Sequence, residues 1–444
     1  MSERISVIGT GYLGATHAAG MAELGHEVIG VDVDAEKIAR LSRGDVPFYE
    51  PGLPELLRKH VDSGRLRFTT DAREAAEFAG VHFIGVGTPQ LKGGYGADIA
   101  YVDAAIETLA PLLTRPAVIL GKSTVSVGTA ARLADRVREL APVGDEAQLG
   151  WNPEFLREGF AVEDTLRPDR LVLGVDLENP GRIEEVARRV YAQALARETP
   201  IVVTDLATAE LVKVSANAFL ATKISFINAV AEVCEATGAD VKDLADAIGY
   251  DERIGRKFLG AGLGFGGGCL PKDIRAFMAR AGELGVDQAL TFLREVDNVN
   301  MRRRQHVVEL AEREVGGSLV DAKIAVLGAA FKPDSDDVRD SPALDVAGQL
   351  HLAGAHVRVH DPEGMANAAQ VWPTLDFADS PEDAVRDVDL VIVATEWRQF
   401  RDLDPAVVGD LVAHRRIIDG RNCLPAEKWI AAGWEYRGLG RHSA

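Results

Sequence analysis

One cysteine stands in a run of glycines, in the segment Leu263-Gly264-Phe265-Gly266-Gly267-Gly268-Cys269-Leu270-Pro271-Lys272-Asp273. Glycine gives up side-chain packing and raises the entropic cost of folding, so this run indicates backbone that approaches a ligand closely or adopts positive φ. Lys272 would favour the thiolate of Cys269, the form that attacks carbon. Asp273 would act as a base or orient a water. The segment therefore suggests a nucleophilic thiol, although an isolated cysteine is more often a small buried hydrophobe.

Two other pairs of polar residues have spacings that could serve catalysis. Glu154 and Glu158 are four residues apart, and so are Lys213 and Asn217, which would share one face of a helix. A cation and an amide donor aimed at one oxygen stabilise a developing alkoxide. Taken alone, the glutamates are better explained as solvated surface, and an exposed polar stripe explains the lysine and asparagine equally well.

A dinucleotide fingerprint opens the chain. Arg4–Ile8 predicts a strand, Gly9-Thr10-Gly11-Tyr12-Leu13-Gly14 a turn into a helix, and Glu27–Val31 a second strand followed by Asp32. The glycines allow a tight turn and close approach to a pyrophosphate at the helix N-terminus, and the acid bonds a ribose hydroxyl. Asp32 favours NAD over NADP, while nearby Lys37 leaves that preference open.

Further unalternating apolar runs at 81–86 and 117–120 predict strands of a parallel sheet covered on both faces. Ligands of such sheets bind beyond the carboxyl ends of the strands, which places Thr88 and Thr124 near a cofactor or substrate. Each threonine alone is equally well explained as a helix cap.

A long helix follows, and the second half of the chain echoes the first. Asp205 is a plausible N-cap for a helix from Leu206 to Cys234, which contains no Pro or Gly and is expected to join two domains. A second helical stretch is expected from Gln288 to about Glu314. The segments 323–328, 354–361 and 389–395 parallel 5–9, 25–32 and 81–88. They predict a second doubly wound domain.

The first turn of this second domain lacks the full glycine pattern, so it should not hold a second dinucleotide. Instead Lys332, Arg339 and Arg421 offer cations at strand ends, suited to the diphosphate of a sugar nucleotide. The alternative interpretation is that each of these three residues is an ordinary surface charge.

Composition narrows the class of protein. A chain of 444 residues is longer than a single hydrophobic core usually supports, so two or three domains are predicted. The composition of 47% hydrophobic and 26% charged residues is typical of a soluble globular protein. No apolar run is as long as a membrane span. The N-terminus lacks the layout of a signal peptide, so the cytoplasm is expected. The net charge of -19 disfavours nucleic acid as a partner, and three widely spaced cysteines argue against a disulfide framework or a zinc site, so no metal is expected.

We expect an α/β protein with two Rossmann-like doubly wound domains joined by a central helical dimerisation region. The predicted divisions are an NAD-binding Rossmann domain at 1–204, a helical region with the long helix and the Gly-Cys loop at 205–316, and a C-terminal sugar-nucleotide-binding domain at 317–444. A helix this long, with apolar residues on several faces, needs more burial than one flanking domain supplies, which favours a homodimer.

With the fingerprint, Thr124, both glutamates, Lys213, Asn217 and the Gly-Cys segment in this order, the chain resembles the UDP-glucose/GDP-mannose dehydrogenase family over nearly its whole length. Members oxidise the primary alcohol of a sugar nucleotide to a carboxylate with two NAD and one water, through a thiohemiacetal and a thioester on a cysteine. The resemblance implies a catalytic set of Cys269, Lys213, Asn217, Asp273, Glu154 and Thr124. In it, Lys213, Asn217 and Asp273 handle alkoxide and water, and Glu154 is an acid/base with Thr124 near the water.

The resemblance also implies the binding residues. Cofactor contacts would be Gly9, Gly11, Tyr12, Leu13, Gly14, Asp32, Lys37, Thr88, Thr124, Glu158, Lys272 and Arg339, with Glu158 at the nicotinamide. Sugar-nucleotide contacts would be Glu154, Phe155, Leu156, Arg157, Lys213, Asn217, Phe258, Leu259, Gly266, Lys332 and Arg421, with Arg253 crossing from the partner subunit. Many relatives have serine where this chain has Gly268. The lost hydroxyl would alter local hydrogen bonding but removes no residue that the chemistry needs.

The expected reaction is the oxidation of UDP-glucose to UDP-glucuronate. The same chemistry on GDP-mannose, a UDP-N-acetylhexosamine or another nucleotide-activated glucose is the alternative, and the segment Pro47-Phe48-Tyr49-Glu50-Pro51-Gly52-Leu53 does not discriminate among them. A noncatalytic NAD sensor or scaffold would be a different class. The joint presence of Cys269, Lys213, Asn217 and Asp273 argues against that class.

Overall fold

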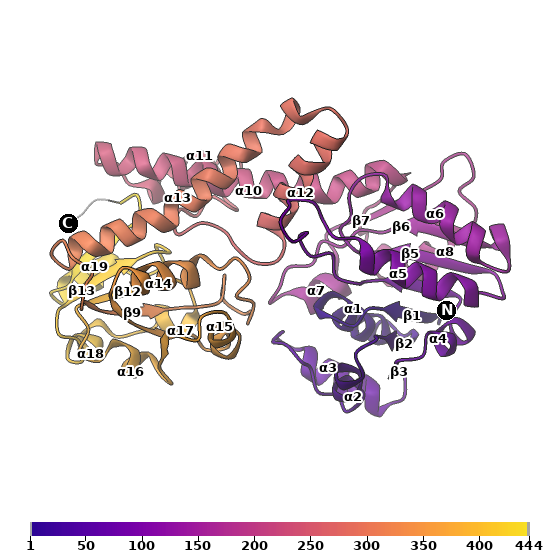
Figure 1. Ribbon diagram of the computed structural model, residues 1–444, viewed down its shortest axis with the longest axis horizontal. Coiled ribbons are helices and arrows are strands. Elements are labelled where there is room, and N and C mark those ends of the chain that lie inside the picture. The colour runs from indigo at the N-terminus through magenta and orange to yellow at the C-terminus, as the bar shows by residue number, and fades with distance from the viewer. Residues whose placement is uncertain (1, 442–444) are drawn as a thin grey trace. The chain divides into compact units, whose positions relative to one another are not determined.

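The computed structural model describes residues 2–441, which form two compact units (Figure 1). One unit contains the residues up to Ala216 together with Arg275–Glu283, and the other contains Asn217–Ile274 together with the residues from Leu284 onward. The boundary falls within a long helix. The predicted division at 204 and 316 stays a prediction.

The first unit is built on an eight-stranded sheet in the order β3-β2-β1-β4-β5-β6-β7-β8. Its strands are β1 (Arg4–Ile8), β2 (Glu27–Val31), β3 (Leu66–Thr69), β4 (Val81–Ile84), β5 (Ala117–Gly121), β6 (Ala147–Trp151), β7 (Leu171–Val175) and β8 (Ile201–Asp205). The first six strands are parallel and have the doubly wound order of a dinucleotide-binding domain. A parallel pair, β7 and β8, is added through an antiparallel contact between β6 and β7, which the sequence pattern did not indicate.

Helices cover both faces of this sheet. They are α1 (Tyr12–Glu23), α2 (Ala35–Ser42), α3 (Leu53–Asp62), α4 (Ala72–Phe78), α5 (Ala100–Leu109), α6 (Thr129–Leu140), α7 (Ala161–Leu166), α8 (Ile183–Val190) and α9 (Ala192–Leu195). Alternate residues of β5 belong to different cores: Val118 and Leu120 pack in the cluster with α1 and α3, whereas Ile119 packs with α5 and α6. This two-sided burial explains why the strand is apolar throughout.

The second unit repeats the architecture and confirms the predicted echo. Its six parallel strands have the order β11-β10-β9-β12-β13-β14. They are β9 (Lys323–Leu327), β10 (His356–His360), β11 (Asp376–Phe377), β12 (Leu390–Val393), β13 (Arg416–Asp419) and β14 (Glu435–Gly438). The accompanying helices are α14 (Pro342–Leu352), α15 (Met365–Val371), α16 (Pro381–Val385), α17 (Arg398–Arg401), α18 (Pro405–Gly409) and α19 (Ala426–Ala431).

Four further helices lie between the two sheets in sequence: α10 (Leu206–Thr237), α11 (Val241–Gly249), α12 (Leu270–Glu283) and α13 (Thr291–Glu314). Asp205 caps α10, since its carboxylate accepts bonds from the Thr208 N–H at 2.8 Å and the Thr208 hydroxyl at 2.7 Å. The helix expected from Gln288 begins instead at Thr291, after a short 3-10 turn at Asp287–Leu290.

By length and composition, α10 is long and apolar enough to cross a membrane. Its alanines and scattered apolar residues raise the average hydropathy without forming a continuous run. A helix that packs within the core of a folded protein can be equally long and apolar. Moreover, α10 contains the buried polar residues Glu210, Lys213 and Asn217.

Candidate active site

The first turn fits a dinucleotide, as its glycines show. Gly9 has φ of 89°, a left-handed conformation that favours glycine. A Cβ at Gly14 would lie 1.8 Å from the carbonyl oxygen of Gly9, so only glycine lets α1 pass this close. A Cβ at Gly11 would meet no atom of the described residues within 4 Å beyond its chain neighbours. The start of α1, which Tyr12 and Leu13 form, is therefore open to a pyrophosphate.

Asp32 follows β2 and faces this turn. Its Oδ2 accepts bonds from the Thr10 N–H at 2.9 Å and the Thr10 hydroxyl at 3.1 Å, and it lies 3.0 Å from Lys37 Nζ. Burial acts to raise the pKa of Asp32, but these hydrogen bonds outweigh burial and hold the pKa below its usual value. The carboxylate is therefore charged, and the Lys37 ammonium is bound to it.

The two predicted threonines lie at neighbouring strand ends. Thr88 follows β4 and Thr124 follows β5, and these strands pair in parallel. The Ser123 hydroxyl donates to the Val86 carbonyl at 2.7 Å and ties the two loops together. Both threonines thus lie at the edge where such sheets bind ligands.

The loop that carries Thr124 is held by two residues that sequence reasoning missed. Glu210 of α10 is buried and accepts bonds from the N–H groups of Gly128 and Ala130, both at 2.7 Å. Arg280 of α12 donates to the Val127 carbonyl at 3.0 Å. The loop is therefore fixed by two helices that are remote in sequence, and no local signal marks either residue.

Glu154 and Lys213 come together, which the sequence alone did not establish. Lys213 Nζ lies 3.0 Å from Glu154 Oε1, and the other carboxylate oxygen accepts a bond from the Leu156 N–H at 2.6 Å. The Phe155 ring lies beneath the same ammonium, 5.6 Å from its centroid. Further along the loop, Arg157 forms a two-pronged ion pair with Asp164. The loop after β6 is therefore ordered by its own side chains.

A buried lysine stands behind Glu154. Lys122 Nζ donates to the Asn152 side-chain oxygen at 3.1 Å, and Tyr191 donates to the same oxygen at 2.6 Å. Burial lowers the pKa of Lys122 to about 8, with nearby Lys213 adding to the shift and Glu154 opposing it. These residues line a cavity of about 50 Å³ that Glu154 also borders, which is large enough to hold water.

Cys269 is exposed at the start of α12. Its carbonyl accepts the Asp273 N–H at 2.9 Å, so it occupies the N-cap position of a 14-residue helix. The N-terminal end of a helix carries partial positive charge, which favours an anion such as a thiolate. This position, one residue before the helix begins, gives the thiol access to a ligand.

Asp273 binds two other residues of the predicted set. The Asn217 amide donates to Asp273 Oδ2 at 2.6 Å, and Lys272 Nζ donates to Asp273 Oδ1 at 2.5 Å. The ammonium expected beside the thiol of Cys269 is therefore bound to a carboxylate. Asp273 is buried and accepts a hydrogen bond at each carboxylate oxygen, which orients it for handling a proton or a water.

The backbone of the glycine segment is held by Asn300, which the sequence analysis did not identify. This buried residue of α13 accepts the Phe265 N–H at 2.7 Å and donates to the Phe265 carbonyl at 2.9 Å. A Cβ at Gly268 would lie 2.3 Å from the Arg339 guanidinium carbon, so glycine lets Arg339 pack against the loop.

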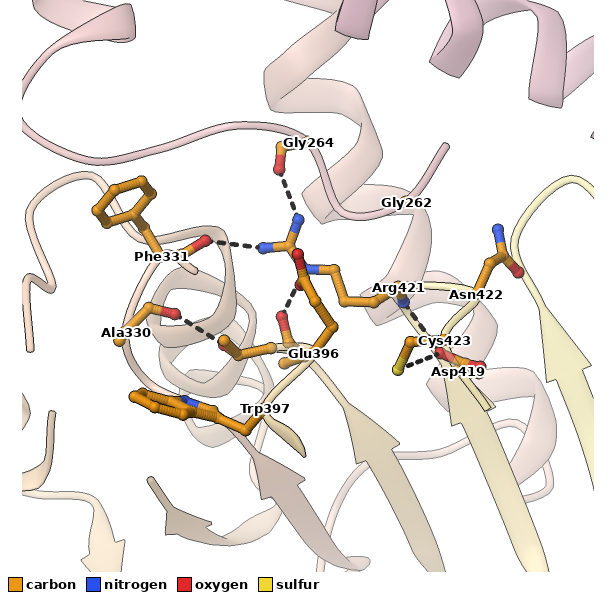
Figure 2. A network of polar contacts seen from close by, with 12 residues as sticks. Gly262, Gly264, Ala330, Phe331, Glu396, Trp397, Asp419, Arg421, Asn422 and Cys423 are labelled. Atoms are coloured by element: carbon orange, nitrogen blue, oxygen red, sulfur yellow. Dashed lines mark hydrogen bonds and ion pairs between the residues drawn. The ribbon is translucent and has the colours of Figure 1, made fainter. Parts of the chain in front are cut away.

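Arg421 follows β13 and reaches three backbone carbonyls (Figure 2). It donates to Ala394 at 2.8 Å, Gly264 at 2.9 Å and Phe331 at 3.2 Å, and its Nε lies 3.4 Å from Glu396. Its guanidinium thus links the glycine segment to the strand ends of the second sheet. Lys332 and Arg339 lie on the loop between β9 and α14, where Arg339 pairs with Asp337 at 2.7 Å.

The remaining predicted contacts differ in exposure. The Arg253 side chain is 89% exposed and pairs with Asp251 at 2.6 Å. Phe258 is also exposed and has φ of 66°, whereas Leu259 is buried against α10 and α11. A Cβ at Gly266 would lie 2.3 Å from the Asp340 carbonyl oxygen. Among residues 2–441 no group of three or more His, Cys, Asp or Glu is placed to hold a metal.

A dinucleotide turn with an acid for the ribose, in a chain that also presents a thiol at a helix N-terminus, suits a nicotinamide-dependent dehydrogenase. Three domain models of one family match the chain: the NAD binding domain at residues 3–195, the central domain at 207–302 and the UDP binding domain at 325–426. The chain belongs to the UDP-glucose/GDP-mannose dehydrogenase family. Its cofactor is NAD.

Similar proteins cover the full chain. A UDP-glucose 6-dehydrogenase of Rhizobium meliloti (strain 1021) is 42% identical over 438 residues, which are 99% of this chain and 99% of the relative. The UDP-glucose 6-dehydrogenase TuaD of Bacillus subtilis (strain 168) is 40% identical over 99% of this chain and 93% of its own. The structure of a UDP-glucose dehydrogenase from the archaeon Pyrobaculum islandicum has a TM-score of 0.90 at 38% identity, covering 100% of this chain and 98% of that one.

Proposed function

We propose that the chain oxidises the primary alcohol of UDP-glucose to the carboxylate of UDP-glucuronate, with NAD as the oxidant in two successive steps. The observation that carries this proposal is the full-length similarity, at about 40% identity, to relatives named for this activity. A structure of a UDP-D-ManNAc dehydrogenase from Pyrococcus horikoshii is also similar, at 27% identity, so the aminosugar remains the second candidate.

The residues have distinct proposed roles. When bound, NAD accepts the hydride in each oxidation. Asp273 takes the proton of the substrate hydroxyl, and Lys213 and Asn217, one helical turn apart on α10, stabilise the alkoxide. The thiolate of Cys269 then bonds to the aldehyde carbon, and the aldehyde oxygen takes back the proton held by Asp273. The resulting thiohemiacetal cannot escape and is able to lose a second hydride.

Hydrolysis completes the reaction. Loss of the second hydride, with transfer of the hydroxyl proton to Asp273, gives a thioester on Cys269. A water near Thr124, deprotonated by Glu154, attacks that thioester and releases the carboxylate and the free thiolate. The Lys213 ammonium lies 3.0 Å from Glu154 and helps to orient this carboxylate.

The number of NADH molecules formed per sugar tests this mechanism. Cys269→Ala should fold and bind NAD but fail to complete the second oxidation, and Cys269→Ser should accumulate an adduct because an oxygen ester leaves far less readily. Mass spectrometry of the peptide that carries residue 269 detects the adduct. Cys234→Ala and Cys423→Ala are the controls, with at most a packing loss of about 1 kcal/mol. Two NADH and a carboxylate product from Cys269→Ala would show that the covalent mechanism is wrong.

The substrate has its own test. The value of kcat/KM is measured for UDP-glucose, GDP-mannose and UDP-N-acetylhexosamines by NADH absorbance. UDP-glucose should give the highest value. A higher value for another sugar nucleotide would move the assignment within the family and leave the chemistry unchanged.

We also propose a cytoplasmic homodimer formed through α10. The exposed side chains Phe219, Phe226 and Val233 are spaced seven residues apart, so they form one apolar stripe on this helix. A two-fold contact along the stripe would bury these side chains. The exposed Arg253 would then reach the neighbouring subunit's substrate.

A further inference from the structure

The carboxylate of Glu50 faces four hydrogen-bond donors. It is buried, and its Oε1 accepts the N–H groups of Ala161 at 2.7 Å and Val162 at 3.4 Å. Its Oε2 accepts the Gly159 N–H at 2.7 Å and the Tyr12 hydroxyl. The site requires two acceptor oxygens. In a glutamine at this position, the NH₂ group would point a donor at groups that are themselves donors.

These donors come from two functional segments. Tyr12 begins α1, directly after the dinucleotide turn. Gly159 ends the loop that carries Glu154 and Glu158, and Ala161 begins α7. Glu50 therefore joins the cofactor turn to the end of the loop with the two glutamates. The Gly159 N–H also lies 3.2 Å from the Tyr12 oxygen, which closes the network.

The turn around Glu50 explains the segment Pro47–Leu53, which had no assigned role. Gly52 has φ of 77° and reverses the chain before α3, and Leu53 is completely buried in the first core. The Phe48 ring packs 5.0 Å from the Tyr12 ring. The segment thus fixes Glu50 from both sides. Burial, the bond to Glu50 and the nearby charge of Glu158 raise the pKa of Tyr12, so its hydroxyl stays a donor.

We propose that Glu50 is a positioning residue that fastens the Glu154–Glu158 loop to the dinucleotide turn and thereby sets how well NAD is held for hydride transfer. The inference rests on the proposed roles of Glu154 and Glu158. Glu50 acts through the backbone of Gly159 and Ala161 and through Tyr12, so its loss should affect cofactor use far more than the binding of UDP by Lys332 and Arg421 of the second unit.

The test is Glu50→Gln, which keeps the shape of the side chain and removes one acceptor oxygen. We expect the KM for NAD to rise about tenfold and kcat to fall about 10- to 100-fold, because the loop is misplaced. The Kd for UDP, measured by calorimetry, should change by less than about twofold. Glu235→Gln is the matched control, because Glu235 accepts bonds from Arg303, His306 and Gly440 outside the proposed site. It should lower Tm without changing the KM for NAD.

Tyr12→Phe provides a second measurement. It removes one hydroxyl, and its effect should not add to that of Glu50→Gln in the double variant, because both act on one network. If Glu50→Gln fails to fold, Tyr12→Phe carries the test, with an expected rise of about threefold or more in the KM for NAD. Wild-type kinetics in a folded Glu50→Gln, strict additivity, or the same kinetic loss in Glu235→Gln would overturn the proposal. Wild-type kinetics in Glu158→Gln would instead refute the role of Glu158 and leave the coupling of Glu50 to Tyr12 intact.

Discussion

Lys213 Nζ lies 3.0 Å from Glu154 Oε1, and both side chains are almost completely buried. A buried charge that loses its partner is strongly destabilising, on the order of 3 kcal/mol or more. Lys213→Met should therefore lower Tm, and adding Glu154→Gln should restore part of the loss, because the second change removes the uncompensated carboxylate.

Activity should respond differently from stability. Glu154→Gln alone should reduce kcat by about 100-fold or more, as expected on loss of an acid/base group. Lys59→Met, which removes a surface lysine paired with Glu23, is the control and should change neither quantity much. Thermal unfolding and steady-state kinetics of the wild type and these four variants check this. Equal destabilisation of Lys213→Met and the double variant would contradict it.

NAD should be strongly preferred to NADP because the charged Asp32 faces the position of the ribose. A 2′-phosphate there meets a like charge, which costs several kcal/mol and corresponds to about 100-fold or more in kcat/KM. Since Lys37 is bound to Asp32 at 3.0 Å, Lys37→Ala should not reduce this preference. Comparison of kcat/KM for the two cofactors decides the question, and equal values would show that Lys37 overrides the acid.

Features set by neighbouring residues could be predicted from the sequence. The strand, glycine turn, helix and Asp32 of the first domain lie within 32 residues, and the structure confirms β1 and β2 at the predicted bounds. The echo around Gly328 was predicted for the same reason. The side chain of Asp361, which follows β10, accepts the N–H groups of Ala329 and Ala330 in the turn of the second domain, at 2.7 and 2.9 Å.

Contacts between distant residues could not be predicted. Glu50 binds Gly159, Glu210 binds Gly128, and Asn300 binds Phe265, and each is a single polar residue whose partner is a backbone group far along the chain. No spacing rule marks such a pair. Arg421 shows the same limit, because its position at a strand end was predicted but its bonds to three carbonyls were not.

Phe226→Glu should disrupt the proposed dimer. Phe226 is 55% exposed and lies in the middle of the stripe on α10, where a carboxylate pair across the two-fold axis would be repelled. Sedimentation should show a monomer. Leu352→Glu is the control, because Leu352 is also exposed and apolar but lies on α14.

Mixed dimers test whether Arg253 is shared. Subunits carrying Arg253→Ala and subunits carrying Cys269→Ala are each expected to be inactive. If Arg253 completes the neighbour's site, refolding them together should restore activity at one site of each mixed dimer. A fully active monomer, or no recovery in a verified mixed dimer, would refute the shared site.

The contribution of Glu210 to the stability of the fold should fall as pH rises from about 5 to about 7. Burial raises the pKa of Glu210 from 4.5 to about 7, opposed by the bonds from Gly128 and Ala130 and by the charge of Arg280. Between these two values the folded state holds a proton that the unfolded chain releases, so raising the pH favours unfolding. The effect amounts to about 1.4 kcal/mol for each unit by which the pKa differs between the folded and unfolded states.

Glu210→Gln has the same shape and does not titrate. The Tm of the wild type minus that of Glu210→Gln should therefore decrease between pH 5 and pH 8, as measured by circular dichroism. A difference that is constant, or that increases with pH, would show that Glu210 is ionised throughout this range and that its bonds to the Thr124 loop are those of a permanent carboxylate.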